Sequence, residues 1–172
     1  WPFIQVLRDV DFSNYDYVLK LHTKGHSKVT GKLDAVPVEG FAWRDILVNA
    51  LLKDSVRFKR CLLRFMRKPR MGLLCSYELL TAAGKVLPED TFLLKKEADR
   101  IGVTLGRVRF CAGTIFMARI DALRKLKDIH FTPEMWTGEQ KSNSMGTLAH
   151  VYERLLCVLV ENEGYRISSI YS

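Results

Sequence analysis

The sequence has no apolar run long enough to cross a membrane. Apolar stretches such as Ile115–Ala118 and Val158–Val160 are only a few residues long, whereas a membrane helix needs about 20. The chain begins at Trp1 without the basic and then apolar pattern of a signal segment. We therefore expect an excised or processed chain that lies in the cytoplasm, where it can be peripheral to the inner face of the cell membrane.

Closely spaced cysteine pairs are missing as well. The cysteines are Cys61, Cys75, Cys111 and Cys157, and none of them forms a CxxC pair, which argues against a zinc site. Three of the four sit in apolar runs. A cysteine in such a run usually acts as a small buried hydrophobe. This pattern favours a reducing compartment.

The composition is that of a single globular domain. The chain has 172 residues, of which 48% are hydrophobic and 27% charged, so a disordered chain is excluded. Periodicity and turn residues predict helices over 2–10, 43–53, 55–66, 88–100, 121–126 and 147–161, and strands over 15–22, 72–75, 109–118 and 165–170. The strand at 109–118 is expected to break at Gly113, and 25–40 and 131–145 are expected to be loops. Because helices and strands intermingle along the chain, we predict the α/β class.

Acidic residues are absent from the helix predicted at 55–66. The chain as a whole is strongly basic, with a formal net charge of +8. Helical spacing puts four arginines on one face, Arg57, Arg60, Arg64 and Arg67, and an apolar set on the other, Phe58, Cys61, Leu62, Phe65 and Met66. Such a stripe can contact an anionic partner or simply face water. A nucleic-acid site would interleave aromatics with the arginines. The phenylalanines lie on the opposite face, so we expect an anionic membrane contact rather than nucleic acid.

Three segments carry candidate binding residues. His22, Thr23 and Lys24 follow the first predicted strand, where ligands of open α/β sheets tend to bind, and His26 and Lys28 come soon after. Trp43 could stack on a sugar while Arg44 holds a phosphate. Gly113 and Thr114 precede a strand, where a glycine allows a ligand to approach closely. The alternatives are a solvated loop, a core tryptophan and an ordinary bulge.

A fourth candidate lies on the helix predicted at 147–161. His150 and Glu153 are three residues apart and share a face, with Arg154 at its border. A carboxylate beside a histidine suits general base chemistry. The alternative is an exposed polar pair.

Taken together, these segments resemble one family. YDYVLKLHTKGHS, WRDILVNALL, GLLC, FCAGTIFMARIDAL, GTLAHVYERLL and GY, in this order and spacing, are similar to the rhamnan synthesis protein F family. The resemblance implies transfer of a sugar from a nucleotide-sugar donor to a lipid-linked or polysaccharide acceptor, as in bacterial O-antigen synthesis. It also implies a three-layer mixed sheet flanked by helices, like the second half of a GT-A glycosyltransferase domain, with the upstream nucleotide-binding half lacking.

The resemblance also guides the site. GT-A enzymes carry a metal-binding pair of aspartates where this chain has His22, Thr23 and Lys24. We therefore expect no tightly bound cofactor and no metal of the carboxylate type, with positive charge on His22 or Lys24 neutralising the diphosphate instead. Glu153 is the preferred base for an inverting transfer, ahead of His150, Glu134 and Glu139. The alternative function is a non-catalytic module that binds polysaccharide or an anionic membrane.

Overall fold

A mixed four-stranded sheet forms the centre of the molecule. The computed structural model describes residues 2–22, 31–33, 36–38, 40–82, 88–106, 108–132, 135 and 147–171. The strand order is β1-β7-β4-β8, with β1 at Tyr17–Lys20, β4 at Met71–Ser76, β7 at Phe116–Arg119 and β8 at Arg166–Ile170. β7 runs antiparallel to both neighbours, while β4 and β8 are parallel. The predicted α/β class and mixed sheet are confirmed.

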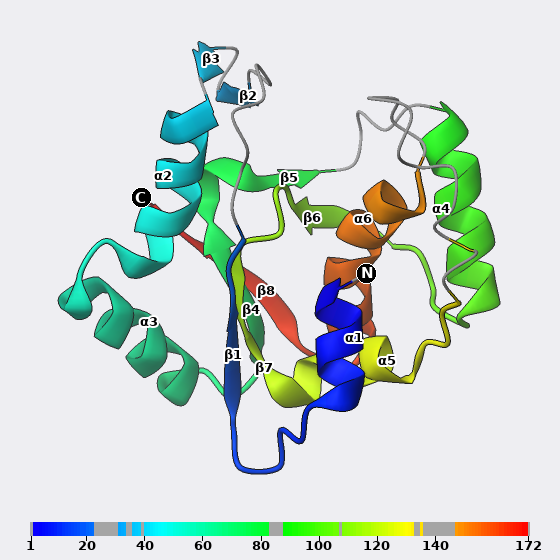
Figure 1. Cartoon of the computed structure of the whole chain (residues 1–172), viewed down its shortest axis with the longest axis horizontal. Helices are drawn as coiled ribbons and strands as arrows, with labels where there is room; N and C mark the ends of the chain where they lie inside the picture. Colours follow the sequence, from blue (N-terminus) through cyan, green and yellow to red (C-terminus); the bar gives the residue numbers. More distant parts are fainter. Residues whose placement is uncertain are drawn as a thin grey trace.

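Helices cover both faces of this sheet, which gives three layers (Figure 1). On one face lie α2 (Gly40–Leu52) and α3 (Ser55–Arg67); on the other lie α1 (Pro2–Asp9), α4 (Pro88–Arg100), α5 (Arg124–Asp128) and α6 (Leu148–Asn162). Each face has its own apolar core. Strand β4 contributes to both, because Leu73 and Cys75 point into one core and Met71 and Leu74 into the other. Every residue of β4 is buried, as expected for a strand that is covered on both faces.

Smaller elements surround the sheet. β5 (Leu80–Ala82) pairs with β6 (Arg109–Cys111), and short 3-10 helices occupy Tyr77–Leu79 and Ile120–Leu123. The strand predicted at 109–118 divides into β6 and β7 around the turn at Gly113, as anticipated.

The loop predicted at 25–40 requires a correction. It holds a hairpin of β2 (Gly31–Leu33) and β3 (Val36–Val38). Pro37 lies within β3 and pairs with Lys32. The prediction was wrong because proline was taken as a loop signal, whereas proline is tolerated in an edge strand such as one of a two-stranded ribbon.

Close packing at Gly72 on β4 gives a first testable prediction. A Cβ atom at Gly72 would lie 2.5 Å from the Cβ of Tyr165 and 2.7 Å from a Cγ of Val160, closer than side chains approach. We expect Gly72→Ala to lower the free energy of unfolding by about 1–3 kcal/mol, because the core must shift to admit the methyl group. Gly106→Ala is the matched control, since nothing lies within 4 Å of its Cβ position. Equal unfolding midpoints in urea for the two variants would contradict this account.

Candidate functional site

The turn between β6 and β7 has an unusual backbone. Gly113 has a φ of 81° and Thr114 a φ of 49°. Glycine adopts such angles freely, but a β-branched residue in the left-handed region is a genuine outlier. Strain of this kind costs about 1–3 kcal/mol and persists only where the surroundings hold it. Two side chains from distant parts of the sequence hold this turn.

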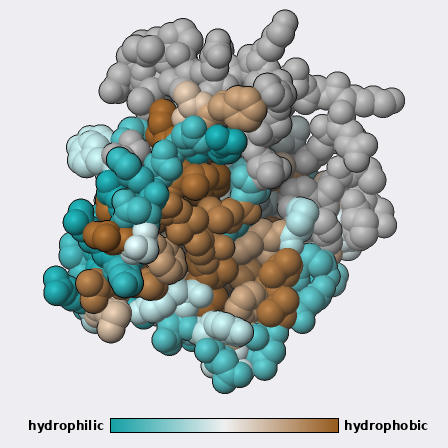
Figure 2. Space-filling model, turned by 60° about the vertical axis from the view of Figure 1, so that its left-hand side comes forward, coloured by the Kyte–Doolittle hydropathy of each residue, from teal (hydrophilic) through white to brown (hydrophobic). Residues whose placement is uncertain are grey.

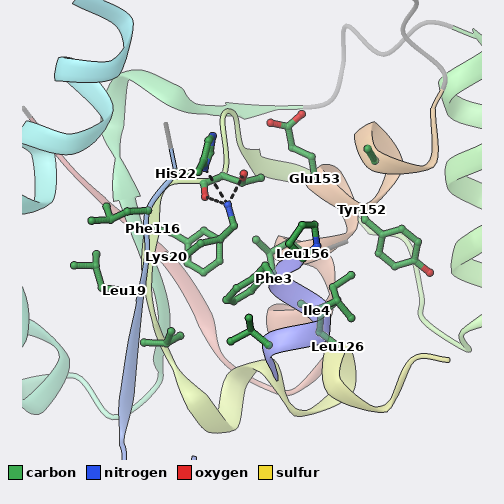
Figure 3. Close-up of a pocket in the computed structure, with 16 residues that line it drawn as sticks. Phe3, Ile4, Leu19, Lys20, His22, Phe116, Leu126, Tyr152, Glu153 and Leu156 are labelled. Atoms are coloured by element: carbon green, nitrogen blue, oxygen red, sulfur yellow. Dashed lines mark hydrogen bonds between the residues drawn. The ribbon is translucent and has the colours of Figure 1, made fainter. Parts of the chain in front are cut away.

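Lys20, the last residue of β1, holds the turn from one side. Its Nζ donates to the Thr114 carbonyl oxygen at 2.9 Å and to the Thr114 Oγ1 at 3.0 Å. The same ammonium lies 3.1 Å from Nδ1 of His22 (Figure 3). Because an ammonium can only donate, this Nδ1 must accept, which places the proton of a neutral His22 ring on Nε2. Lys20 thus contacts both Thr114 and His22.

Glu153, on α6, holds the turn from the other side. Its Oε1 accepts a hydrogen bond from the Gly113 backbone N–H at 2.6 Å. Within the part of the chain that the structure describes, its second carboxylate oxygen makes no hydrogen bond. Figure 3 shows the carboxylate at the rim, on the same side of the pocket as His22. The glutamate therefore has one oxygen fixed and one available.

These groups stand at the polar end of a pocket of about 600 Å³. Most of the wall is apolar and comes from α1, β1, β7, α5 and α6. Its side chains include Phe3, Ile4, Leu19, Phe116, Leu126 and Leu156 (Figure 3). The polar lining includes Lys20, His22, Thr114 and Glu153. An apolar cavity with a few convergent polar groups is the usual form of a ligand site.

A buried network supports α6 behind this pocket. The Tyr152 hydroxyl donates to Oε2 of Glu97 at 3.0 Å, and Arg100 donates to the same hydroxyl at 2.9 Å. Burial raises the pKa of Tyr152, and the neighbouring Glu97 carboxylate acts in the same direction. Tyr152 is one of the residues that line the pocket, but its hydroxyl is directed away from the pocket, toward α4 (Figure 3). Sequence analysis missed this group because its partners lie more than 50 residues away.

The structure brings together only some of the residues singled out from the sequence. His22, Thr114 and Glu153 line the pocket, and Gly113 joins them through its bond to Glu153. Thr23 and Lys24, together with His26, Lys28, Glu134 and Glu139, lie outside the described residues. Sequence analysis did not select Lys20, although a charged residue ending an otherwise apolar strand was the available signal.

The remaining candidates make contacts away from the pocket lining. Trp43 packs against the core between α2 and the sheet. Arg44 forms an ion pair with Asp45 at 2.5 Å. His150 bonds through Nδ1 with the hydroxyl of Thr147, the N-cap of α6, at 2.8 Å.

Arg154 is buried, with 6% of its surface exposed. Its guanidinium donates to the His150 carbonyl and lies over the ring of Phe110. Arg154 therefore packs within the fold and does not line the pocket.

No metal site is evident in the described ranges, where no group of three or more His, Cys, Asp or Glu side chains could hold an ion. Since Thr23 and Lys24 lie outside these ranges, the expectation about the turn that follows β1 stays a prediction.

The arginine stripe of α3 divides into two pairs. Arg57 donates to the Tyr171 carbonyl at 2.8 Å, and Arg64 donates to the Ser169 carbonyl at 3.0 Å, so both bind the outer edge of β8. Arg60 and Arg67 are exposed. Phe58, Cys61, Leu62 and Phe65 pack inward as predicted. Met66 does not pack inward, since 66% of its surface is exposed. At about 100° per residue, it lies at the margin of the apolar face of the helix.

Comparisons with known proteins agree with the sequence motifs. The profile of the family described as rhamnan synthesis protein F matches residues 1–165. Two curated relatives, from two strains of Xanthomonas campestris pv. campestris, are each described as the uncharacterized protein WxcX and are 31% identical over 171 residues. The alignment covers 98% of this chain but 23% of each relative. No solved structure matches the chain significantly.

The clamp on Thr114 gives a second prediction. Lys20→Met keeps the apolar stem and removes the ammonium, and we expect it to lower the free energy of unfolding by about 1–3 kcal/mol because Thr114 loses two hydrogen bonds. In a Thr114→Gly background the loss should be smaller, since glycine adopts the turn without strain. Chemical denaturation of the four proteins of this double-mutant cycle measures the coupling. An identical loss in both backgrounds would show that Lys20 does not hold the turn.

Proposed function

Because the chain belongs to the rhamnan synthesis protein F family, we propose that it forms part of a glycosyltransferase that builds a bacterial cell-surface polysaccharide. Family membership ties the chain to polysaccharide synthesis. The reaction we propose is the transfer of a sugar from a nucleotide donor to an acceptor hydroxyl. As the chain spans 23% of the length of its curated relatives, this is the reaction of the whole protein, to which the described pocket contributes.

One observation carries this proposal: His22, Thr114 and Glu153, from three distant segments, meet at the polar end of a single apolar pocket. A set of unrelated surface residues would have no reason to converge. The strained turn between them points the same way, because strain tends to be retained at functional sites.

Glu153 is suited to act as the base. Its Oε1 is fixed by the Gly113 N–H at 2.6 Å, while the other oxygen can take the proton of an acceptor hydroxyl. As that proton leaves, the acceptor oxygen bonds to the anomeric carbon of the donor sugar. The bond from that carbon to the diphosphate breaks, and the diphosphate departs with the electron pair. Attack from the opposite side inverts the anomeric centre.

Positive charge stabilises the departing diphosphate. The Lys20 ammonium is already engaged by Thr114 and His22, so it would act through its field and through the orientation it gives His22. His22, at the same end of the pocket, would help to bind the diphosphate. The apolar walls of the pocket suit the hydrocarbon part of a lipid-linked acceptor.

The base assignment is tested with Glu153→Gln in the full-length protein. The amide oxygen of glutamine can still accept from Gly113, so we expect unchanged thermal unfolding. Transfer should fall by about 100-fold or more, because the amide takes up no proton. Nucleoside diphosphate release from a panel of nucleotide sugars measures turnover. Glu163→Gln, at the C-terminal end of the same helix, is the control and should keep full activity. Full activity of Glu153→Gln would remove the glutamate from the mechanism.

We propose a second function, in which α3 contacts an anionic membrane surface. Arg60 and Arg67 are exposed, and neither bonds to the β8 edge as Arg57 and Arg64 do. In the described ranges, no helix is both long and apolar enough to cross a membrane. Any attachment through α3 would therefore be peripheral. A basic residue near such a surface contributes about 1 kcal/mol.

Vesicle co-sedimentation tests this contact. We expect the Arg60→Gln/Arg67→Gln variant to bind anionic vesicles about tenfold or more weakly than the parent chain. Binding should also weaken with salt, because exposed charges are screened. Lys95→Gln/Lys96→Gln, two exposed charges on α4 across the sheet, is the control of equal net charge. If both variants bind alike, or if neutral vesicles bind equally well, α3 is merely a solvated face.

A further inference from the structure

The two edges of the central sheet differ. β1 is one edge strand and β8 the other. At the C-terminal end of β8, the carbonyls of Ser169 and of Tyr171, the residue after the strand, accept hydrogen bonds from arginines of α3, which cover that end of the edge. In the part of the chain that the structure describes, no strand pairs with the outer side of β1.

The register identifies which backbone groups of β1 face outward. Ile120 N–H donates to the Asp16 carbonyl, one step before β1 begins. Hydrogen-bonded pairs alternate along an antiparallel ladder, so Val18 and Lys20 exchange bonds with Ala118 and Phe116 of β7. The N–H and C=O groups of Tyr17 and Leu19 are therefore directed away from β7, toward the open side.

Apolar surface flanks this edge on both faces. Val18 faces the core beneath α1, whereas Tyr17 and Leu19 pack with the core beneath α2 and α3. Leu19 nevertheless lines the pocket on the α1 side, so the pocket extends over the edge of the strand. Leu21, just after β1, and Val6, on α1, also line the pocket, and each is 46% exposed. Figure 2 shows a broad hydrophobic area in the middle of one face of the molecule. A free edge with this much apolar surface is one that proteins normally cover.

We propose that the outer edge of β1 pairs with an additional β-strand from the same longer polypeptide, a strand with apolar side chains at successive positions. Both faces of β1 are apolar, so the added strand would extend both cores. The relatives are long enough to provide such a strand. The alignment covers 23% of each, so the remaining 77% lies outside the aligned region. A second copy of the chain is disfavoured, since two copies with a formal charge of +8 each repel.

The added strand would also border the candidate site. β1 ends at Lys20, and His22 follows at the polar end of the pocket, so a strand alongside β1 would place its own residues at this rim. The inference rests on the sheet edge and stands whether or not the pocket transfers a sugar.

Amide hydrogen exchange tests the proposal. In the 172-residue chain, we expect the amides of Val18 and Lys20 to be protected and those of Tyr17 and Leu19 to exchange about 100-fold or more faster. In the full-length xanthomonad relative, read by mass spectrometry with fragmentation to single residues, all four aligned positions should be protected to within about tenfold. The Val18 and Lys20 positions are the internal control, because their partner β7 is present in both proteins.

Two outcomes would overturn the proposal. One is retention of the alternating pattern in the full-length relative, which would mean that the edge stays open. The other is protection of Tyr17 and Leu19 in the isolated chain that rises with protein concentration and coincides with a dimer in sedimentation velocity. That result would assign the edge to a second copy of the chain.

Discussion

The Lys20 ammonium is the interaction on which the site depends. It holds a strained threonine by two hydrogen bonds and a histidine by a third contact, and so joins the end of β1 to the start of β7. Taking a lysine partly out of water is unfavourable unless its donors are satisfied. Here Thr114 supplies two acceptors and His22 a third contact.

The same turn links the sheet to α6. Gly113 donates to Glu153, whose helix is in turn fixed to α4 by Tyr152, Glu97 and Arg100. The position of the carboxylate is thus determined by contacts from the sheet and from a second helix. Such support from behind is what a site needs if its geometry is to be held within a fraction of an ångström.

Arginine side chains give the sheet its asymmetry. The sequence predicts that the four arginines of α3 share one face. In the structure Arg57 and Arg64 bind carbonyls at the β8 edge, and of these four Arg60 and Arg67 are exposed. A helical wheel shows which residues share a face but not what lies opposite that face. One edge is therefore closed by the chain's own side chains, and β1 carries the outward-facing backbone groups.

The sequence by itself determined the α/β class, most helix and strand positions, the break at Gly113 and the family, because periodicity, turn residues and motif order are local properties. It also indicated His22 and Glu153. Only the tertiary structure decided that Lys20 holds Thr114, since these residues are 94 positions apart and meet through the pairing of β1 with β7. Likewise the sequence favoured a core role for Trp43 over a sugar contact, and the structure shows it partly buried and packed against one core. Residue type and spacing restrict what a side chain can do, but the partner that it meets depends on which distant strands and helices pack together.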